Sequence, residues 1–334
     1  MKASAFVYPW DVNGDPEAPA RIAALGTAQV TLASAYHSTR ALTPRHPRHR
    51  VVTAEHAAVL YPVGDGWTDQ ALRPVPAGDW APGDAFGEAA AALADAGLEV
   101  HTWVVLAHSS RLGWYGLAHL HAHDKTAGVA LGDAGQYLMS LCFCASCREG
   151  YGTRGLDAGE LAAAVRAALE PVWRGAPSDG GWAGVGKLLG EETAEATRAW
   201  RDETARTLQE AAVAAVRRAA PEGFQVLLHA DPVSYHCGAN AGVDPAHILS
   251  VADGVVVPCT GDAGLLTPFA GEAREDTVLA ANFTVVSGMG GSPGTLAADA
   301  DRARRLGATE LRLYHAGLAS DGDLAAVRTA LAGL

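Results

Sequence analysis

The sequence predicts an α/β fold of the (β/α)8-barrel type, formed by a single domain over residues 1–334. Two observations predict this class. Short apolar runs rich in Val, Leu and Phe alternate with longer Ala-rich stretches as far as the last residues, which is typical of a parallel sheet covered by helices. The chain of 334 residues also has the size of such a barrel, which takes about 250 residues, or more with insertions.

Seven apolar runs are predicted to form the strands, and Ala-rich runs between them are predicted to form helices. The strands cover residues 5–8, 29–33, 99–106, 224–228, 254–257, 283–286 and 310–313. Helices are expected over residues 17–25, 85–96, 161–169, 187–219 and 324–331. A complete barrel has eight strands, so this pattern lacks one.

The missing strand falls between residues 106 and 224, where no convincing apolar run of strand length occurs. A barrel would place its third helix and fourth strand near residues 111–115. We therefore expect an incomplete barrel, or one that lacks a helix–strand unit near Gly113 and Trp114.

Residues 40–82 are predicted to form an inserted, lid-like loop after the second strand. The segment has β-like runs at residues 51–52 and 57–61 and several prolines, which are Pro44, Pro47, Pro62, Pro74, Pro76 and Pro82. Barrel enzymes build substrate lids from loops at this end of the strands.

Composition and charge argue against several classes of protein. No window approaches the ~18 uninterrupted apolar residues of a membrane span, so no membrane association is expected. The formal net charge of −12 has the wrong sign for a phosphate-binding surface, so nucleic acid is not an expected partner. Five cysteines, an odd number, and a start without signal-peptide features indicate reduced thiols and a cytoplasmic location.

Polar and aromatic side chains follow the carboxyl ends of the predicted strands. In a barrel these ends meet at one mouth, where the activity lies. An aromatic ring can stack on the C–H face of a sugar while neighbouring polar groups bind its hydroxyls. We therefore predict a pocket for a carbohydrate-like small molecule, with ligand contacts from Trp10, Tyr36, His37, His108, His123, His229, Tyr314 and His315.

A glycosidase needs two carboxylates at the mouth. Asp124 and Asp231, each beside a histidine in a predicted mouth loop, are the candidates for the catalytic acid and base. Residues 287–289, after the strand at residues 283–286, which takes the position of the seventh strand in a complete barrel, carry no acid. This departs from the ordinary retaining glycosidase. Asp231 also precedes a proline, so a role in a turn or at a helix start is the alternative.

Three alternating histidines form the first candidate metal site, although the predicted function requires no cofactor. His119, His121 and His123 would lie on one side of a strand-like segment, at a spacing that suits a metal. The alternatives are contacts to the substrate or an exposed position on the surface.

Three cysteines form the second candidate metal site. Cys142, Cys144 and Cys147 have the C-x-C-x-x-C spacing that can supply zinc ligands. They follow the apolar run of residues 137–141, where cysteine also serves as a small buried hydrophobic residue. Bound zinc and structural burial therefore both remain open.

The run Leu-Cys-Phe-Cys-Ala-Ser-Cys-Arg at residues 141–148, with residues 103–112 and 119–125, resembles an uncharacterised family of Ala-rich barrel proteins from high-GC bacteria. That family is distantly similar to glycoside hydrolases, so the resemblance implies a (β/α)8 barrel and a carbohydrate-like ligand. This chain departs from the family pattern at Ser109 and Asp124, where Asn and Glu are expected. The family also has an acid-tipped strand at the position of Gly113 and Trp114, and this chain lacks it.

Together these patterns predict a glycoside-hydrolase-like protein that binds, and could hydrolyse, a carbohydrate or polyol. One alternative is a metal-dependent hydrolase or isomerase that uses the histidine cluster at residues 119–123. Another is a binding protein without catalytic activity, because the acid after the seventh strand is missing. The substrate, the reaction and the oligomeric state stay open.

Overall fold

The computed structural model describes residues 1–70, 73–105, 128–131, 139–143, 145–174, 176, 186–187, 189–233 and 242–334. The chain divides into two compact units. Unit 1 combines Met1–Ser110 with Gly254–Leu334, and unit 2 is Arg111–Asp253. Each unit has an apolar core of its own.

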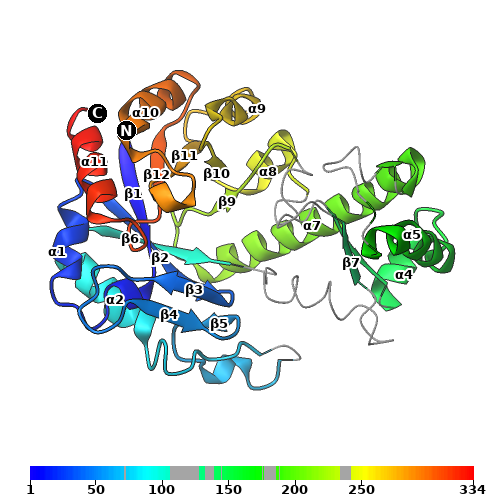
Figure 1. The fold of residues 1–334 in the computed structure, drawn as a ribbon, viewed down its shortest axis with the longest axis horizontal. Coiled ribbons are helices and arrows are strands. Elements are labelled where there is room, and N and C mark those ends of the chain that lie inside the picture. Colours follow the sequence, from blue (N-terminus) through cyan, green and yellow to red (C-terminus); the bar gives the residue numbers. More distant parts are fainter. Residues whose placement is uncertain are drawn as a thin grey trace. The chain divides into compact units, whose positions relative to one another are not determined.

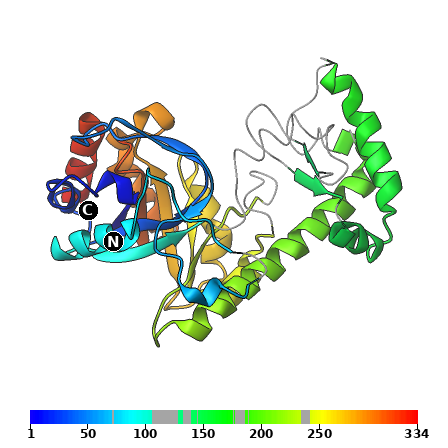
Figure 2. The ribbon, with the colours of Figure 1, turned by 90° about the horizontal axis from the view of Figure 1, so that it is seen from below.

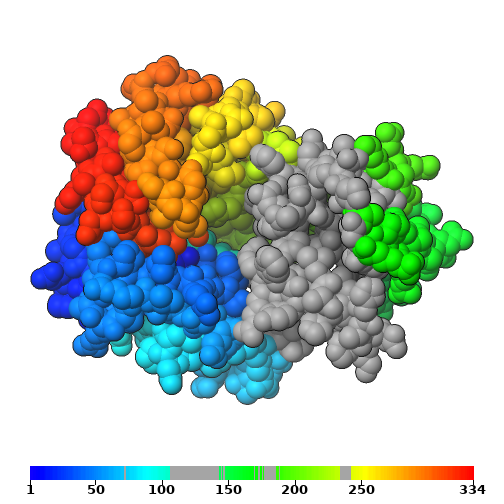
Figure 3. Space-filling model, in the orientation of Figure 1, coloured from blue at the N-terminus to red at the C-terminus, as the bar shows by residue number. Residues whose placement is uncertain are grey.

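A curled, mostly parallel sheet forms the centre of unit 1 (Figure 1). Its strands are β1 (Lys2–Val7), β2 (Gln29–Tyr36), β5 (Ala58–Val59), β6 (Glu99–Val104), β10 (Gly254–Pro258), β11 (Val278–Thr284) and β12 (Glu310–Tyr314). They lie in the order β5-β2-β1-β12-β11-β10, and β6 also pairs with β2. These pairs are parallel, except that β5 is antiparallel to β2. Because β1 pairs with β12, residues near the two termini border each other on the surface (Figure 3).

The (β/α)8 barrel predicted from the sequence is wrong. Over its described strands, the sheet of unit 1 curls as a half-barrel and does not close into a ring. Between β6 and β10 in the chain, strands β7 (Gly128–Leu131) and β8 (Met139–Cys142) pair antiparallel with each other in a sheet of their own. They therefore do not extend the parallel sheet. The position near Gly113 and Trp114, where the sequence predicts a missing unit, lies outside the described residues.

The sheet of unit 1 has two different faces because side chains alternate along each strand. One face is apolar: Val7 and Leu32 pack with Leu93 in a core under helices α1 (Ala18–Ala23) and α2 (Ala85–Asp95). Helices α10 (Leu296–Arg305) and α11 (Asp321–Ala332) also lie outside the sheet (Figure 1). The other face is polar towards the amino ends of the strands, where the hydroxyls of Ser4 and Thr31 are 2.7 Å apart.

The carboxylate of Asp323 joins the start of helix α11 to the loop that follows β11. The Ser320 hydroxyl accepts a hydrogen bond from the Asp323 amide at 3.1 Å, and the Asp323 carboxylate accepts one from the Ser320 amide at 3.1 Å. This capping box defines where the helix begins. The same carboxylate accepts a hydrogen bond from the Ser287 hydroxyl at 2.6 Å, so it also holds the loop that follows β11.

The segment predicted as an insertion contains an antiparallel hairpin, formed by β3 (Thr39–Leu42) and β4 (Val51–Ala54). Its buried side, which includes Val52, packs in the same core as Tyr8 and Tyr36. The hairpin therefore lies beside the carboxyl ends of β1 and β2.

The described part of unit 2 consists mainly of helices. These are α4 (Ala145–Gly152), α5 (Ala158–Trp173), α7 (Glu191–Ala219) and α8 (Pro245–Val251), and a short strand, β9 (Leu227–His229), lies between the last two. Figure 2 shows α7 as one long continuous helix. Gly150 of α4 lies so close to the Trp200 ring of α7 that a larger side chain would not fit there. In the described part of the chain, no helix combines the length and the apolar character needed to cross a membrane.

Candidate functional site

Aromatic side chains gather where neighbouring strands of unit 1 end. Tyr8 directly follows β1, Tyr36 ends β2, Trp103 lies one residue before the end of β6, and Tyr314 ends β12. Parallel strands have their carboxyl ends at the same edge of a sheet, which is where α/β proteins bind ligands. These four residues and His315, whose ring stacks on Tyr8 with centroids 4.1 Å apart, are called the aromatic cluster below.

A chain of phenol hydroxyls runs through the aromatic cluster. The Tyr8 hydroxyl donates to the Tyr36 hydroxyl at 3.0 Å, and the hydroxyl oxygens of Tyr36 and Tyr314 are 3.5 Å apart. Burial raises the pKa of both Tyr8 and Tyr36 above the usual value for tyrosine. These two hydroxyls therefore stay protonated at neutral pH and can each donate and accept hydrogen bonds.

Trp103 joins the members of the cluster. Its ring centroid lies 4.9 Å from that of Tyr36 and 6.1 Å from that of Tyr314, both in edge-to-face contact. Tyr8 and Tyr36 are 2% and 6% exposed, whereas Trp103 and Tyr314 are partly exposed. The cluster therefore has a buried floor of two tyrosines and an accessible rim formed by Trp103 and Tyr314.

His37 adds a polar group beside the cluster. Its ring stacks on Tyr36 with centroids 4.2 Å apart, and its Nδ1 lies 2.7 Å from the carbonyl oxygen of Ser38. A carbonyl oxygen only accepts, so Nδ1 carries the proton of this hydrogen bond. Burial lowers the pKa of His37, which favours the neutral ring and leaves Nε2 as a hydrogen-bond acceptor.

A buried acid and a buried histidine lie behind the cluster. The Asp11 carboxylate accepts a hydrogen bond from the Tyr8 amide at 2.8 Å, and its Oδ2 lies 3.9 Å from Nδ1 of His315. Burial raises the pKa of Asp11 to about 7 and lowers the pKa of His315 to about 3. At neutral pH, His315 is therefore uncharged and Asp11 is only partly ionised.

The free energy of unfolding is expected to depend on pH through both Asp11 and His315, and the two dependences have opposite signs. The pKa of Asp11 is about 7 in the folded state, against an ordinary value of 3.8. Between these two pH values the folded state binds more protons at Asp11 than the unfolded state does, so the free energy of unfolding falls as pH rises. The pKa of His315 is about 3 in the folded state, against an ordinary value of 6.5. Between these two pH values the unfolded state binds more protons at His315 than the folded state does, so the free energy of unfolding rises with pH. The two slopes oppose each other between about pH 4 and 6.5.

Single substitutions separate the two slopes. In Asp11→Asn, stability is expected to rise with pH between about pH 4 and 6.5, by up to about 1.4 kcal/mol per pH unit. In His315→Gln, stability is expected to fall with rising pH over the same window. Urea unfolding at several pH values measures both. Variants that keep the slope of the natural sequence would contradict the assignment of either group.

The structure brings together five of the residues predicted from strand ends. Tyr36, Tyr314 and His315 belong to the aromatic cluster, His37 stacks on it, and Trp10 stacks on Tyr8 with centroids 4.6 Å apart. Trp10 is 3% exposed and His315 is fully buried. These two residues therefore support the site from behind. Because both are buried, the ligand contacts predicted for them fit the partly exposed Trp103 and Tyr314 better.

Other predicted residues lie in the described part of unit 2. Asp231 is 4% exposed, and its carboxylate accepts a hydrogen bond from the Val233 amide at 2.9 Å, which is the turn role that the sequence left as an alternative. His229 ends β9 and is exposed. Cys147 lies in α4 and is partly exposed.

The remaining predicted residues cannot be placed. His108, His119, His121, His123, Asp124 and Cys144 lie outside the described residues, and Cys142 is described only as a residue of β8. Among the described residues, no group of three His, Cys, Asp or Glu side chains is arranged to hold a metal ion. Both metal sites thus stay predictions.

Tyr8 and Trp103 are site residues that the sequence analysis did not single out. Trp103 lies inside β6 and Tyr8 directly follows β1, whereas the sequence analysis placed the site in the loops after the predicted strands. A signal was present in the sequence, because Phe6 and Tyr8 are two residues apart and so lie on one face of the strand.

Comparison with models of known protein families, and with curated proteins, gives no match for this chain.

Proposed function

We propose that unit 1 binds a small hydroxyl-rich molecule, a carbohydrate or a polyol, at the aromatic cluster. The observation that carries the proposal is a partly exposed rim of Trp103 and Tyr314 directly beside a chain of protonated phenol hydroxyls. An aromatic face packs on the apolar C–H surface of a sugar, and neighbouring polar groups fix its hydroxyls. The ring of His37 lies beside this chain of hydroxyls and stacks on Tyr36.

Hydrolysis of a bound sugar would in addition need a pair of carboxyl groups at the aromatic cluster. Glycosidases act through two carboxyl groups about 5–10 Å apart. Asp11 lies behind the cluster and is 9% exposed, so it fits the support of Tyr8 better than contact with a substrate. Asp124 and Asp231 stay the predicted acid and base. Binding is therefore the function that the geometry supports best.

The proposed location is the cytoplasm. Cys259 is a buried free thiol, and a reduced compartment keeps such side chains from oxidation. The proposed partner is a small molecule, because the rim offers aromatic and hydroxyl groups and the chain carries a net charge of −12, which repels nucleic acid.

Replacing Trp103 by alanine is expected to weaken saccharide binding by ~10-fold or more, because it removes the largest apolar surface of the rim. The measurement is isothermal titration of the natural sequence and the variant with a panel of mono- and oligosaccharides and sugar alcohols. Tyr314→Phe, which removes only a hydroxyl, is expected to have a smaller effect of ~3–10-fold.

Trp67→Ala is the matched control. Trp67 lies in a short 3-10 helix, Asp65–Trp67, and is 39% exposed, so its removal changes the same residue type without touching the cluster. Affinity in this variant should equal that of the natural sequence. If no member of the panel binds, or if Trp67→Ala and Trp103→Ala weaken binding equally, the proposed site is wrong.

A further inference from the structure

The hairpin of β3 and β4 concentrates positive charge in an acidic chain. Residues 40–50 contain four arginines, Arg40, Arg45, Arg48 and Arg50, and two histidines, but no acidic residue. The whole chain has a formal net charge of −12, so this segment differs in sign from the rest of the protein. A local positive field of this kind attracts an anionic partner.

Arg45 has a structural role within this segment. Its Nη2 donates to the carbonyl oxygens of Ala316 at 2.6 Å and Gly317 at 3.2 Å, and its Nη1 donates to that of Ala319. Its guanidinium also lies 3.9 Å from the carboxylate of Asp321. Arg45 therefore holds the turn of the hairpin against the loop after β12, and a partner would have to be bound by the other arginines.

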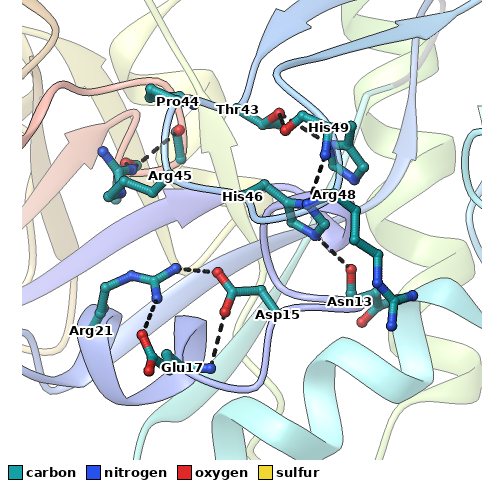
Figure 4. Close-up of polar contacts among 12 residues, drawn as sticks. Asn13, Asp15, Glu17, Arg21, Thr43, Pro44, Arg45, His46, Arg48 and His49 are labelled. Atoms are coloured by element: carbon teal, nitrogen blue, oxygen red, sulfur yellow. Dashed lines mark hydrogen bonds and ion pairs between the residues drawn. The ribbon is translucent and has the colours of Figure 1, made fainter.

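Hydrogen bonds inside the turn fix its shape (Figure 4). His46 is buried; its Nε2 lies 3.0 Å from the carbonyl oxygen of Asn13, and its Nδ1 accepts a hydrogen bond from the Arg48 amide at 3.1 Å. The Thr43 hydroxyl donates to the carbonyl oxygen of His49 at 2.9 Å. Because the turn is already held in one shape, a partner that binds it would not have to order it first.

The charges of Arg40, Arg48 and Arg50 are not compensated within the described residues. All three side chains are exposed, and the ion pairs of the described part of the chain include none of them. The guanidinium of Arg50 donates to the carbonyl oxygen of Pro44, which positions the group across the turn and leaves its charge in place. These three arginines can therefore pair with carboxylates of a partner.

An exposed aliphatic pair lies among these charges on the outward face of the hairpin. Side chains alternate along a strand, so Val52 faces the core while its neighbour Val51 faces outward. Leu42 and Val51 are directly opposite each other in the two strands and are 61% and 46% exposed. Arg40 lies two residues before Leu42, and Arg50 directly precedes Val51. The outward face thus combines an aliphatic centre with guanidinium groups on both sides of it.

We propose that this outward face is a docking surface for an acidic peptide segment of a partner protein. Carboxylates of the segment would lie beside Arg40, Arg48 and Arg50, whose planar N–H donors match a carboxylate. Aliphatic side chains of the segment would cover Leu42 and Val51 and remove them from water.

Charge and chemistry favour a peptide over nucleic acid as the occupant of this surface. A sugar–phosphate backbone offers no aliphatic group to Leu42 and Val51, and the net charge of −12 repels a polyanion that extends beyond the hairpin. A short acidic peptide touches only the hairpin. The proposal does not depend on sugar binding at the aromatic cluster, since it concerns other residues and another partner.

Fluorescence anisotropy of a labelled peptide, titrated with the whole chain, tests the proposal. The probe repeats two glutamates and two leucines, so that in an extended conformation each of its faces presents both residue types in alternation. Saturable binding is expected, with a dissociation constant on the order of 100 μM, as for a small transient contact. A peptide with serine in place of leucine, and one with lysine in place of glutamate, should each bind at least ~5-fold more weakly.

Substitutions of exposed residues locate the surface. Arg40→Gln and Arg50→Gln are each expected to weaken binding of the glutamate–leucine peptide by ~3-fold, and together by ~10-fold. Leu42→Ser is expected to weaken it by ~3-fold or more. Arg302→Gln in α10 and Leu208→Ser in α7 are the matched controls, because both residues are exposed and lie outside the hairpin. Peptide binding by these two variants should equal that of the natural sequence.

Several results would overturn the proposal. A peptide that does not bind would mean that the arginines only keep the hairpin from pairing with other strands. Equal binding of the serine and leucine peptides would reduce the surface to a general basic patch. Displacement of the peptide by a lower concentration of a single-stranded oligonucleotide would assign the surface to nucleic acid. Equal weakening by Arg40→Gln and Arg302→Gln would place the peptide elsewhere.

Discussion

Replacing Gly317 by alanine is expected to lower the free energy of unfolding by about 3 kcal/mol, a large effect for a single methyl group. A Cβ at position 317 would overlap the carboxylate of Asp11. Asp11 cannot move aside cheaply, because it is 9% exposed and accepts the hydrogen bond of the Tyr8 amide. The methyl group would therefore separate the loop after β12 from the turn after β1, where the aromatic cluster is built.

Gly322→Ala is the matched control for this prediction. Gly322 lies five residues further on, in the first turn of α11, and a Cβ there would meet the Ser320 hydroxyl oxygen at an ordinary 3.7 Å. Alanine is the better helix former, so this change should leave stability unchanged or raise it by up to about 1 kcal/mol. Urea unfolding of both variants gives the comparison. Equal stability of the two alanine variants would contradict the close packing described at Gly317.

Replacing Arg312 by leucine is expected to cost about 3–5 kcal/mol of stability, because it leaves a poorly solvated charge without its partner. The Arg312 side chain is 2% exposed and lies 2.7 Å from the carboxylate of Glu310, whose side chain is 14% exposed. Arg312 also donates to the side-chain oxygen of Gln29 at 3.1 Å. The substitution therefore breaks a polar connection between β12 and β2 on the inner face of the half-barrel.

A double-mutant cycle separates the charge from the shape of Arg312. Arg312→Leu with Glu310→Leu removes both charges, so the double variant is expected to be more stable than Arg312→Leu alone by about 1–3 kcal/mol. Thermal and urea unfolding measure the four proteins of the cycle. A double variant that is less stable than Arg312→Leu would show that loss of packing, and not the unpaired Glu310 carboxylate, dominates.

Much of the secondary structure of unit 1 follows from local sequence patterns. The predicted strand at residues 310–313 corresponds to β12, and the predicted helix at residues 85–96 corresponds to α2. The strand predicted at residues 283–286 instead spans Val278–Thr284. The middle of β11 contains two alanines and an asparagine, which are weak strand signals, although Leu279 and Ala281 are buried.

The closed barrel was the wrong inference because it ignored the inner face of the strands. Gln29 and Thr31 alternate with Val30 and Leu32, and Arg312 alternates with Leu311. Such alternation is typical of a sheet whose two faces differ, whereas the interior of a closed barrel is filled mostly by branched apolar side chains. The polar residues at these positions were visible in the sequence and argue against a barrel core of the usual kind.

The candidate site was predictable in part. Tyr36, His37 and Tyr314 follow from the rule that strand ends carry function, and this rule holds for any parallel sheet, whether closed or open. The pairing of Asp11 with His315 was not predictable, because it depends on the contact between the loop after β1 and the loop after β12, which are some 300 residues apart in the chain. Long-range contacts of this kind leave no local signal.

The most direct test of the proposed sugar site follows the indole N–H signals of the eight tryptophans by ¹H–¹⁵N NMR during titration with the tightest ligand of the panel. Trp103 is partly exposed at the rim and Trp67 lies outside the cluster, and single substitutions assign their signals. The account predicts that the Trp103 signal shifts with the binding curve while that of Trp67 stays in place. A ligand that binds without moving the Trp103 signal would contradict it.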